Sequence, residues 1–309
     1  MDGPVRQLDP LVSVCIPTYN RARKLQRAVD ALLASSYKNL EIIISDNASS
    51  DDTENICAAL AQSDRRVRYF RHSENQGPTA NFEYARSQAT GKYFLWHGDD
   101  DHLDPNYIGA CINELENDQS LVLVSGVAAY HRGDGNITGY GKVIQPSSDS
   151  PMLRVTKYIW LVTENSIFCG AYRRAAVEEC TMPNCLAGDW IWMAEVLLKG
   201  KAKVLPTIRV HRDYGDNTSS SLRRIASTIK APPYHARFPR TAVSLNLAGH
   251  LSAFIVNSNP SLTRNKYFIF FALFNLVFLK QIGWSIRLRI AHGRHPGTPQ
   301  RPRPGAGGD

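Results

Sequence analysis

Short apolar runs alternate with helical patterns along the first 125 residues. Continuous apolar runs at 11–16, 40–45, 67–71, 93–97 and 121–125 predict buried strands. Between them, apolar side chains recur at helical spacing, as in Leu25, Val29 and Leu32, and predict helices over 23–33, 51–60, 79–87 and 104–115. This alternation predicts an α/β fold with a mainly parallel, doubly wound sheet flanked by helices.

Boundary signals place the ends of several of these helices. Asp51 followed by Glu54 predicts a capping pair, Thr79 and Asp104 are candidate caps, and Gly91 is a candidate stop. Past residue 126 the pattern loosens. A hairpin turn is expected at 133–136, a polar loop at 144–151, a helix at 189–198 and a strand at 203–210.

Three consecutive carboxylates end the fourth apolar run. In an extended segment Asp99 and Asp101 share a face while Asp100 points away. Two oxygen ligands placed in this way suit a hard divalent ion such as Mg²⁺ or Mn²⁺, which can hold a diphosphate. A solvated acidic turn is the alternative. In a doubly wound sheet, the segments at 17–21, 46–52 and 99–101 all follow strands and converge on one edge, which favours the metal site.

Composition and charge divide the chain. Apolar residues make up 43% of its 309 residues, enough for a sizeable core. The net charge of +8 is uneven, because residues 222–309 carry 13 Lys or Arg against a single acid. We therefore expect a catalytic domain at 1–221, a basic, apolar helical extension at 222–295 and a disordered tail at 296–309. Cysteines without metal-ligand spacing, and a start without a secretory pattern, predict a cytoplasmic protein.

The extension suggests an anionic partner. Residues 267–279 are strongly apolar, and Lys280, Arg287, Arg289 and Arg294 follow. This pattern predicts a helix lying on the cytoplasmic face of a membrane. A core helix, or one that packs on a second copy, is the alternative. Nucleic acid is not expected as a partner, because no recognisable binding module is present.

Four motifs together carry a resemblance. The segments at 14–21, 44–53, 75–77 and 98–101 resemble, in order and spacing, a family-2 glycosyltransferase with the GT-A fold, over residues 10–215. The resemblance implies a GT-A-type, Rossmann-like sheet with a C-terminal helical extension. The Ser-Asp-Asn-Ala-Ser and Gly-Asp-Asp-Asp variants also resemble a branch that contains O-antigen deoxysugar (abequosyl-like) transferases.

The resemblance implies roles for particular residues. Those expected to bind the nucleotide are Pro17, Thr18, Tyr19, Arg21, Asp46, Asp99 and Asp100. Asp46 would hydrogen-bond the base. Asp101 would be the main metal ligand, with Asp99 and His211 beside it, and Arg212 is an alternative contact for the diphosphate. Each residue also has a purely structural alternative. Asp46 would then be a turn residue, Tyr19 a core aromatic, and Arg21 and His211 surface residues.

The same resemblance implies a catalytic base. Asp189 matches the aspartate of the family's Glu-Asp element, although Gly188 stands where the family often has glutamate. A helix cap is the ordinary alternative for Asp189. Residues 165–173 would border the acceptor cleft. The implied function is an inverting, metal-dependent transfer from a nucleotide-sugar to a hydroxyl of a glycan or polyprenyl-linked acceptor in cell-surface polysaccharide synthesis. Two alternatives stay open: a non-catalytic nucleotide- or carbohydrate-binding protein of this fold, and a nucleotidyltransferase.

Overall fold

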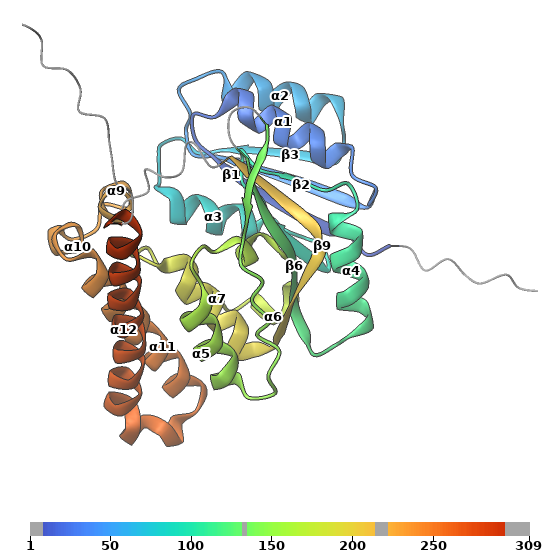
Figure 1. The fold of residues 1–309 in the computed structure, drawn as a ribbon. Coiled ribbons are helices and arrows are strands. Elements are labelled where there is room, and N and C mark those ends of the chain that lie inside the picture. The colour runs from blue at the N-terminus through green and yellow to red at the C-terminus, as the bar shows by residue number, and fades with distance from the viewer. Residues whose placement is uncertain (1–8, 132–134, 214–221, 294–309) are drawn as a thin grey trace, which may run out of the picture.

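A single mixed sheet organises the protein (Figure 1). The computed structural model describes residues 9–131, 135–213 and 222–293, without the side chains of 213, 223–224 and 284–293. Within these residues nine strands form one sheet in the order β3-β2-β1-β4-β8-β6-β9-β5, and β7 pairs with β6. The strands are β1 (Val12–Thr18), β2 (Leu40–Asp46), β3 (Val67–Arg71), β4 (Tyr93–Trp96), β5 (His102–Leu103), β6 (Leu121–His131), β7 (Ile137–Tyr140), β8 (Ala171–Arg173) and β9 (Lys201–Asp213).

The sheet has a parallel half and a mixed half. The pairs β1–β2, β2–β3 and β1–β4 are parallel, as the alternating sequence pattern predicts. Beyond β4, short β8 runs antiparallel to both β4 and β6, and β5 runs antiparallel to β9. The predicted α/β class with a mainly parallel sheet is confirmed, since β6 and β9, the two longest strands, also pair in parallel. The loosened pattern after residue 126 corresponds to the mixed half.

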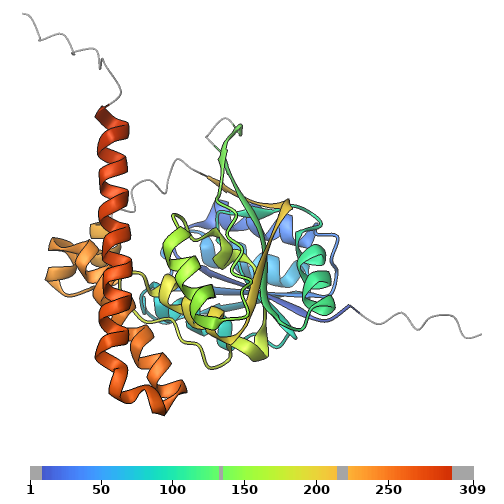
Figure 2. The same ribbon diagram turned by 60° about the horizontal axis from the view of Figure 1, so that its bottom comes forward.

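Helices pack on both faces of the sheet (Figures 1 and 2). In the catalytic body they are α1 (Ala22–Leu33), α2 (Thr53–Ser63), α3 (Pro78–Ser87), α4 (Tyr107–Asn117), α5 (Pro151–Leu161), α6 (Arg174–Val177) and α7 (Gly188–Lys199), with a 3-10 turn η1 (Ser166–Cys169). Their buried faces pack around strands β1, β2 and β4, whose side chains are almost all buried. This core fixes the strand ends on which the site stands.

Several predicted boundaries were wrong. Asp104 does not cap α4, whose N-cap is Asn106; its carboxylate instead accepts a hydrogen bond from the Arg209 backbone N–H at 2.7 Å. Thr79 does not cap α3, which follows Gly77. Gly91 does not end that helix; a Cβ there would lie 2.6 Å from the Leu11 carbonyl oxygen, so the residue is required for close packing of β1.

Of the remaining boundary predictions, one was wrong, one is supported and one lies outside the described residues. Asp51 does not form the predicted capping pair; it accepts a hydrogen bond from Thr53 N–H at 3.1 Å, and Glu54 pairs with Arg71. The predicted hairpin is supported by antiparallel β6 and β7, although two of the four residues of its turn, 133 and 134, lie outside the described residues. The tail predicted to be disordered at 296–309 also lies outside them.

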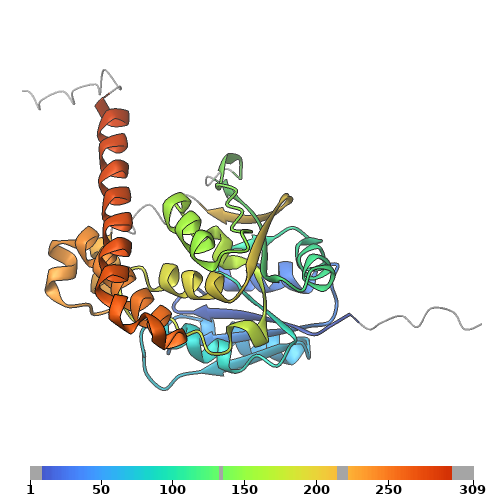
Figure 3. The same cartoon turned by 90° about the horizontal axis from the view of Figure 1, so that it is seen from below.

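The C-terminal extension forms a separate helical layer. It comprises α9 (Leu222–Thr228), α10 (Pro233–Arg237), α11 (Pro239–Ser258), a 3-10 turn η2 (Pro260–Asn265) and α12 (Lys266–Gly293). Figures 2 and 3 show α12 beside α11 at the edge of the molecule, extending past the catalytic body. Leu273 and Val277 are buried, whereas Tyr267 and Phe268 are 77% and 76% exposed. One face of α12 therefore packs on the body and another is open.

Lys280 shows how α12 is attached. Its ammonium group donates hydrogen bonds to the backbone carbonyls of Ile159, at 2.6 Å, and Val162, at the end of α5. It also lies 4.4 Å from the Trp190 ring centroid. Burial lowers the pKa of Lys280 to about 7. Lys280 was expected in the basic surface flank of this helix; it is instead an anchor between α12 and the catalytic body.

Candidate active site

Parallel strands bring three sequence motifs to one edge of the sheet. Thr18, the last residue of β1, is the register partner of Asp46, the last residue of β2. β4 lies on the other side of β1 and ends at Trp96, just before the acidic run. The predicted convergence of the segments after these strands is therefore confirmed.

The acidic run is a turn, and each aspartate in it has a different partner. Asp99 accepts a hydrogen bond from Thr18 Oγ1 at 2.8 Å. Asp100 forms an ion pair with Arg21 at 2.7 Å. Asp101, only 2% exposed, forms an ion pair with Arg212 of β9 at 3.2 Å. The predicted alternation of an extended segment was wrong, since the Asp101 N–H donates back to the Gly98 carbonyl at 3.3 Å.

Electrostatics mark Asp99 as the carboxylate most in need of a cation. Burial first, and then the charges of Asp100 and Asp101, raise its pKa to about 6, although the Thr18 hydrogen bond opposes them. A divalent ion beside Asp99 would relieve this repulsion, and carboxylate oxygens are the donors that Mg²⁺ and Mn²⁺ prefer. The donor set therefore fits a metal ion, with Asp99 better placed than Asp101, whose carboxylate is already paired with Arg212.

Two neighbouring cavities, of 350 and 330 Å³, lie at this edge of the sheet. The first, of 350 Å³, has both predicted and unpredicted lining residues: Pro17, Thr18, Tyr19, Arg21, Asn47, Asn75, Pro78, Asn81, Phe82, Asp99 and Thr228. Five predicted nucleotide-binding residues are thus together in one cavity. Asp46 and Asp100 are not among its lining residues.

Three asparagines line this cavity although none was predicted as a site residue from the sequence. The side-chain amide of Asn81 donates to the Ser45 carbonyl at 3.0 Å and to the Thr18 carbonyl at 3.3 Å, which ties β1 to β2. Asn47 and Asn75 are joined by a 2.9 Å hydrogen bond. Asn75 belongs to the Asn-Gln-Gly motif at 75–77, so the sequence did single out this segment, but no role in binding was predicted for it.

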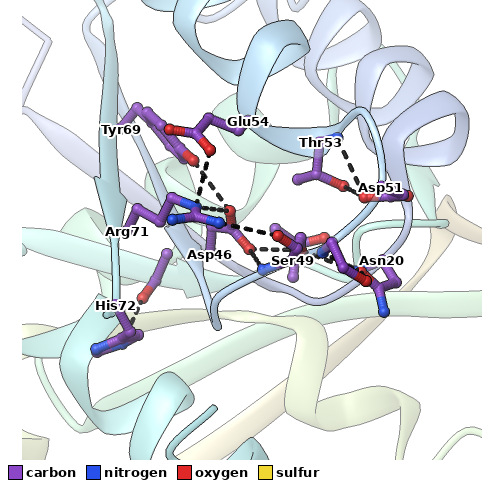
Figure 4. A network of polar contacts seen from close by, with 12 residues as sticks. Asn20, Asp46, Ser49, Asp51, Thr53, Glu54, Tyr69, Arg71 and His72 are labelled. Carbon is purple, nitrogen blue, oxygen red and sulfur yellow. Dashed lines mark hydrogen bonds and ion pairs between the residues drawn. The ribbon is translucent and has the colours of Figure 1, made fainter. Parts of the chain in front are cut away.

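Asp46 lies at the centre of a buried polar network rather than at the cavity surface (Figure 4). Its Oδ1 accepts hydrogen bonds from the Ser49 N–H at 2.9 Å and from the Ser49 hydroxyl. Its Oδ2 accepts one from Tyr69 at 2.9 Å and lies 3.4 Å from Arg71 Nε. The side chain is fully buried. Contact with a nucleotide base stays a prediction, since it requires exchange of one of these partners.

Asp189 stands in the first turn of α7, where a carboxylate is favoured by the helix dipole. It does not cap the helix, because the N-cap is Ala187, with a φ of 65°. Asp189 Oδ2 accepts a hydrogen bond from the Asn165 amide at 2.8 Å, and Asn165 Oδ1 accepts one from Tyr158 at 2.8 Å. Burial raises the pKa of Asp189, and the Asn165 hydrogen bond lowers it. This chain of contacts orients a carboxylate of raised basicity.

Gly188 has a structural cause. A Cβ at this position would lie 2.3 Å from the backbone oxygen of Pro183. A glutamate at this position therefore does not fit beside the Pro183 carbonyl in this backbone.

The second cavity, of 330 Å³, adjoins the first. Pro78 and Phe82 line both, and Asp189 lines the second. Most other lining residues are apolar, including Met182 and Trp190, and Val243 and Gln281 come from α11 and α12. Trp192, by contrast, is fully buried in the aromatic core and is not available to a ligand.

His211 is separated from Asp99 and Asp101 of the acidic run. Its neighbour Arg212 pairs with Asp101, whereas His211 contacts Asp104 and two other histidines. The structure thus does not bring His211 together with Asp99 and Asp101 as a ligand set, and Arg212, weighed as its alternative, is the residue of this pair that contacts the acidic run.

Comparison with known proteins decides the family. The sequence model for "Glycosyl transferase family 2" matches residues 13–181, more than half of the chain. The chain belongs to this family. The matched region runs from β1 to the segment after α6, so it includes the loops after β1, β2 and β4 and ends before Asp189.

Named relatives agree. A stretch of 134 residues is 32% identical to "Glycosyltransferase GlyG" of Streptococcus pneumoniae, covering 43% of this chain and 44% of that protein. Another of 95 residues is 39% identical to the "GalNAc(5)-diNAcBac-PP-undecaprenol beta-1,3-glucosyltransferase" of Campylobacter jejuni, covering 30% and 31%. The chain thus spans less than half of the length of these relatives.

Solved structures agree on the fold. S. aureus TarS 1–349 in complex with UDP-GlcNAc has a TM-score of 0.55 at 14% identity, covering 89% of this chain and 91% of that one. A mannosyltransferase from Pyrobaculum calidifontis, in complex with GDP-Man and Mn²⁺, has a TM-score of 0.51 at 15% identity, covering 93% and 80%. The chain therefore has a GT-A-type sheet with a C-terminal helical region.

Proposed function

We propose that this glycosyltransferase moves a sugar, with inversion, from a nucleoside-diphosphate donor to a hydroxyl of a lipid-linked or glycan acceptor in cell-surface polysaccharide synthesis. One observation carries the proposal: two cavities share the wall formed by Pro78 and Phe82, and one is lined by Asp99, the other by Asp189. A donor bound in the first would have its anomeric carbon near a base that lines the second. An O-antigen-type glycan is the product class that the sequence motifs favour.

The donor cavity supplies binding and charge. Pro17, Thr18 and Tyr19 line it for the nucleotide, and Arg21 also lines it, for the diphosphate. Asp99 and Asp101 would hold a Mg²⁺ or Mn²⁺ ion. When bound, this ion neutralises charge that develops on the departing nucleoside diphosphate.

Asp189 acts as the general base. Its carboxylate takes the proton of the acceptor hydroxyl while the hydroxyl oxygen forms a bond to the anomeric carbon. The bond from that carbon to the diphosphate breaks, and its electron pair leaves with the diphosphate. Attack from the side opposite the leaving group inverts the configuration. Asn165 holds the carboxylate in place through its 2.8 Å hydrogen bond.

The acceptor cavity is apolar, which favours an acceptor that carries a lipid. Within the segment Pro260–Gly283, a window of 18 residues has a mean hydropathy of 1.3, and 17% of that window is buried, so the segment is long and apolar enough to cross a membrane by length and composition. We propose that it lies against the cytoplasmic membrane face, because α12 also lines the acceptor cavity through Gln281. The relative from Campylobacter jejuni, named for an undecaprenol-linked acceptor, agrees with this class.

A donor panel tests the proposal. Wild-type protein is incubated with UDP-, GDP-, CDP- and dTDP-sugars, with and without Mn²⁺, beside Asp99→Asn, Asp101→Ala and Asp189→Asn. We expect metal-dependent release of one nucleoside diphosphate, lost in the Asp99 variant, and retained donor binding without turnover in the Asp189 variant. Release of pyrophosphate instead would identify a nucleotidyltransferase. Donor binding without any turnover by wild type, with acceptor lipid supplied, would identify a non-catalytic binding protein.

A further inference from the structure

Three histidines from three strands meet on the far half of the sheet. His102 is the first residue of β5 and the register partner of His211 on β9. His131 ends β6 and is paired with Asp213, two residues along β9 from His211, so both histidines lie on the same face. One ring nitrogen from each of the three lies within 4.8 Å of the others.

Hydrogen bonds fix which ring nitrogens carry protons. His131 Nδ1 lies 2.9 Å from the Gly135 carbonyl oxygen, which can only accept, so Nδ1 is the protonated nitrogen. His211 Nε2 lies 2.8 Å from Asp104 Oδ1, so Nε2 donates there in the same way. In neutral rings this leaves the lone pairs of His131 Nε2 and His211 Nδ1 facing each other.

These two nitrogens are 2.8 Å apart. Opposed lone pairs at that distance repel, unless a cation lies between or beside them. A ring nitrogen whose opposite N–H is held by a carboxylate or a carbonyl is the arrangement in which histidine binds transition metals. Asp104 is itself held, because its Oδ2 accepts a hydrogen bond from the Arg209 N–H at 2.7 Å. The second shell of a metal site is therefore already in place.

His102 supplies a third imidazole. Its ring stacks on His211 with centroids 4.4 Å apart and planes 4° apart, and the residue is exposed. An exposed ring on the sheet edge can turn its nitrogen toward the pair. Tetrahedral zinc with nitrogen ligands at about 2.0–2.1 Å requires ligand atoms about 3.3 Å apart. The His131–His211 pair then opens by roughly half an ångström.

We propose that His102, His131 and His211 bind a Zn²⁺-class transition-metal ion, oriented by Asp104 and the Gly135 carbonyl. Three imidazoles favour Zn²⁺, Cu²⁺ or Ni²⁺ over the Mg²⁺ or Mn²⁺ that suit the aspartates. The site is distinct from the acidic run, because successive residues of a strand point to opposite faces and Arg212 points to Asp101. Bound metal would join β5, β6 and β9 and so hold the strand that directly follows Asp101.

Metal binding by the full chain, prepared without a polyhistidine tag and stripped with EDTA, tests the proposal. Zn²⁺ is titrated in competition with a chromophoric chelator, and Co²⁺ is added separately to read its coordination geometry from visible absorption. We expect one tight equivalent in wild type and tetrahedral Co²⁺ spectra. His102→Ala and His131→Gln should each weaken binding by at least tenfold, and Asp104→Asn by about 10- to 100-fold.

Two controls separate this site from others. His250→Gln changes an exposed histidine on α11 and should bind as wild type does. Asp99→Asn should also retain the Zn²⁺ site. Because His102 is exposed, the His102→Ala variant should fold even if the His131→Gln variant does not. Failure of wild type to bind Zn²⁺ saturably would overturn the proposal in favour of a proton shared by the two rings. Loss of binding in Asp99→Asn but not in His102→Ala would also overturn it, because the ion would then lie at the acidic run.

Discussion

Asn165 donates a hydrogen bond from its side-chain amide to Asp189 at 2.8 Å. Asn165 directly precedes η1, and Asp189 lies in the first turn of α7, so the contact exists only in the folded chain. It stabilises the ionised form of a carboxylate whose pKa burial raises. Asn165 is thus a positioning residue for the proposed base.

Removal of this contact should change the pH profile. We expect Asn165→Ala to raise the pKa of Asp189 further and move the acidic limb of kcat to higher pH, because the base must be ionised. Loss of orientation should lower kcat by up to about 100-fold, against about 10²- to 10⁴-fold for Asp189→Asn. Asn113→Ala, at an exposed position on α4, is the control. An unshifted acidic limb in Asn165→Ala would remove Asn165 from the mechanism.

Thr18 and Asp99 should control metal binding through pH. The pKa of Asp99 is raised to about 6, so Mn²⁺ affinity should rise as pH increases through 6 and the carboxylate ionises. Thr18→Val removes a hydrogen bond that lowers this pKa. The rise in affinity should therefore move to higher pH in the variant. Mn²⁺ titration followed by electron paramagnetic resonance between pH 5 and about 8 measures it, and identical profiles for both proteins would contradict the assignment.

Gly188 should tolerate no side chain. A Cβ there would meet the Pro183 oxygen at 2.3 Å, so Gly188→Ala should lower the free energy of unfolding by about 1–3 kcal/mol. Gly249→Ala is a matched control inside α11, where nothing lies within 4 Å of the added Cβ. It should stabilise the protein by about 0.5–1 kcal/mol. Thermal and denaturant unfolding compare the two, and equal stability of both variants would show that the 183–188 loop moves aside.

The exposed face of α12 should bind membranes. Tyr267, Phe268 and Phe271 are 77%, 76% and 58% exposed, so their replacement by serine leaves the core intact. Each large apolar side chain contributes about 1.5 kcal/mol or more when buried. The triple variant should therefore partition at least tenfold less onto anionic phospholipid vesicles in sedimentation assays. Tyr140→Ser, 60% exposed on β7, is the control. Unchanged sedimentation of the triple variant would leave this face for another partner.

The parallel half of the sheet and the convergence of its loops could be read from the sequence. Apolar runs such as the one in β2, whose seven residues are all buried, specify strands locally, and parallel pairing then forces their ends to one edge. The mixed half could not be read in this way. β8 has three residues and β5 two, so their positions depend on pairing with β6 and β9 rather than on local pattern.

Site residues divide along the same line. The sequence by itself determined that Thr18, Tyr19, Arg21 and Asp99 belong to one loop cluster. These residues lie at or just after the ends of predicted parallel strands, and such ends meet at one edge of the sheet. Only the tertiary structure decided what each carboxylate and imidazole contacts. Asp101 pairs with Arg212, 111 residues away, and His211 lies 80 residues from His131. Such contacts depend on strand order and on which face each residue takes, and neither is encoded within a window of neighbouring residues.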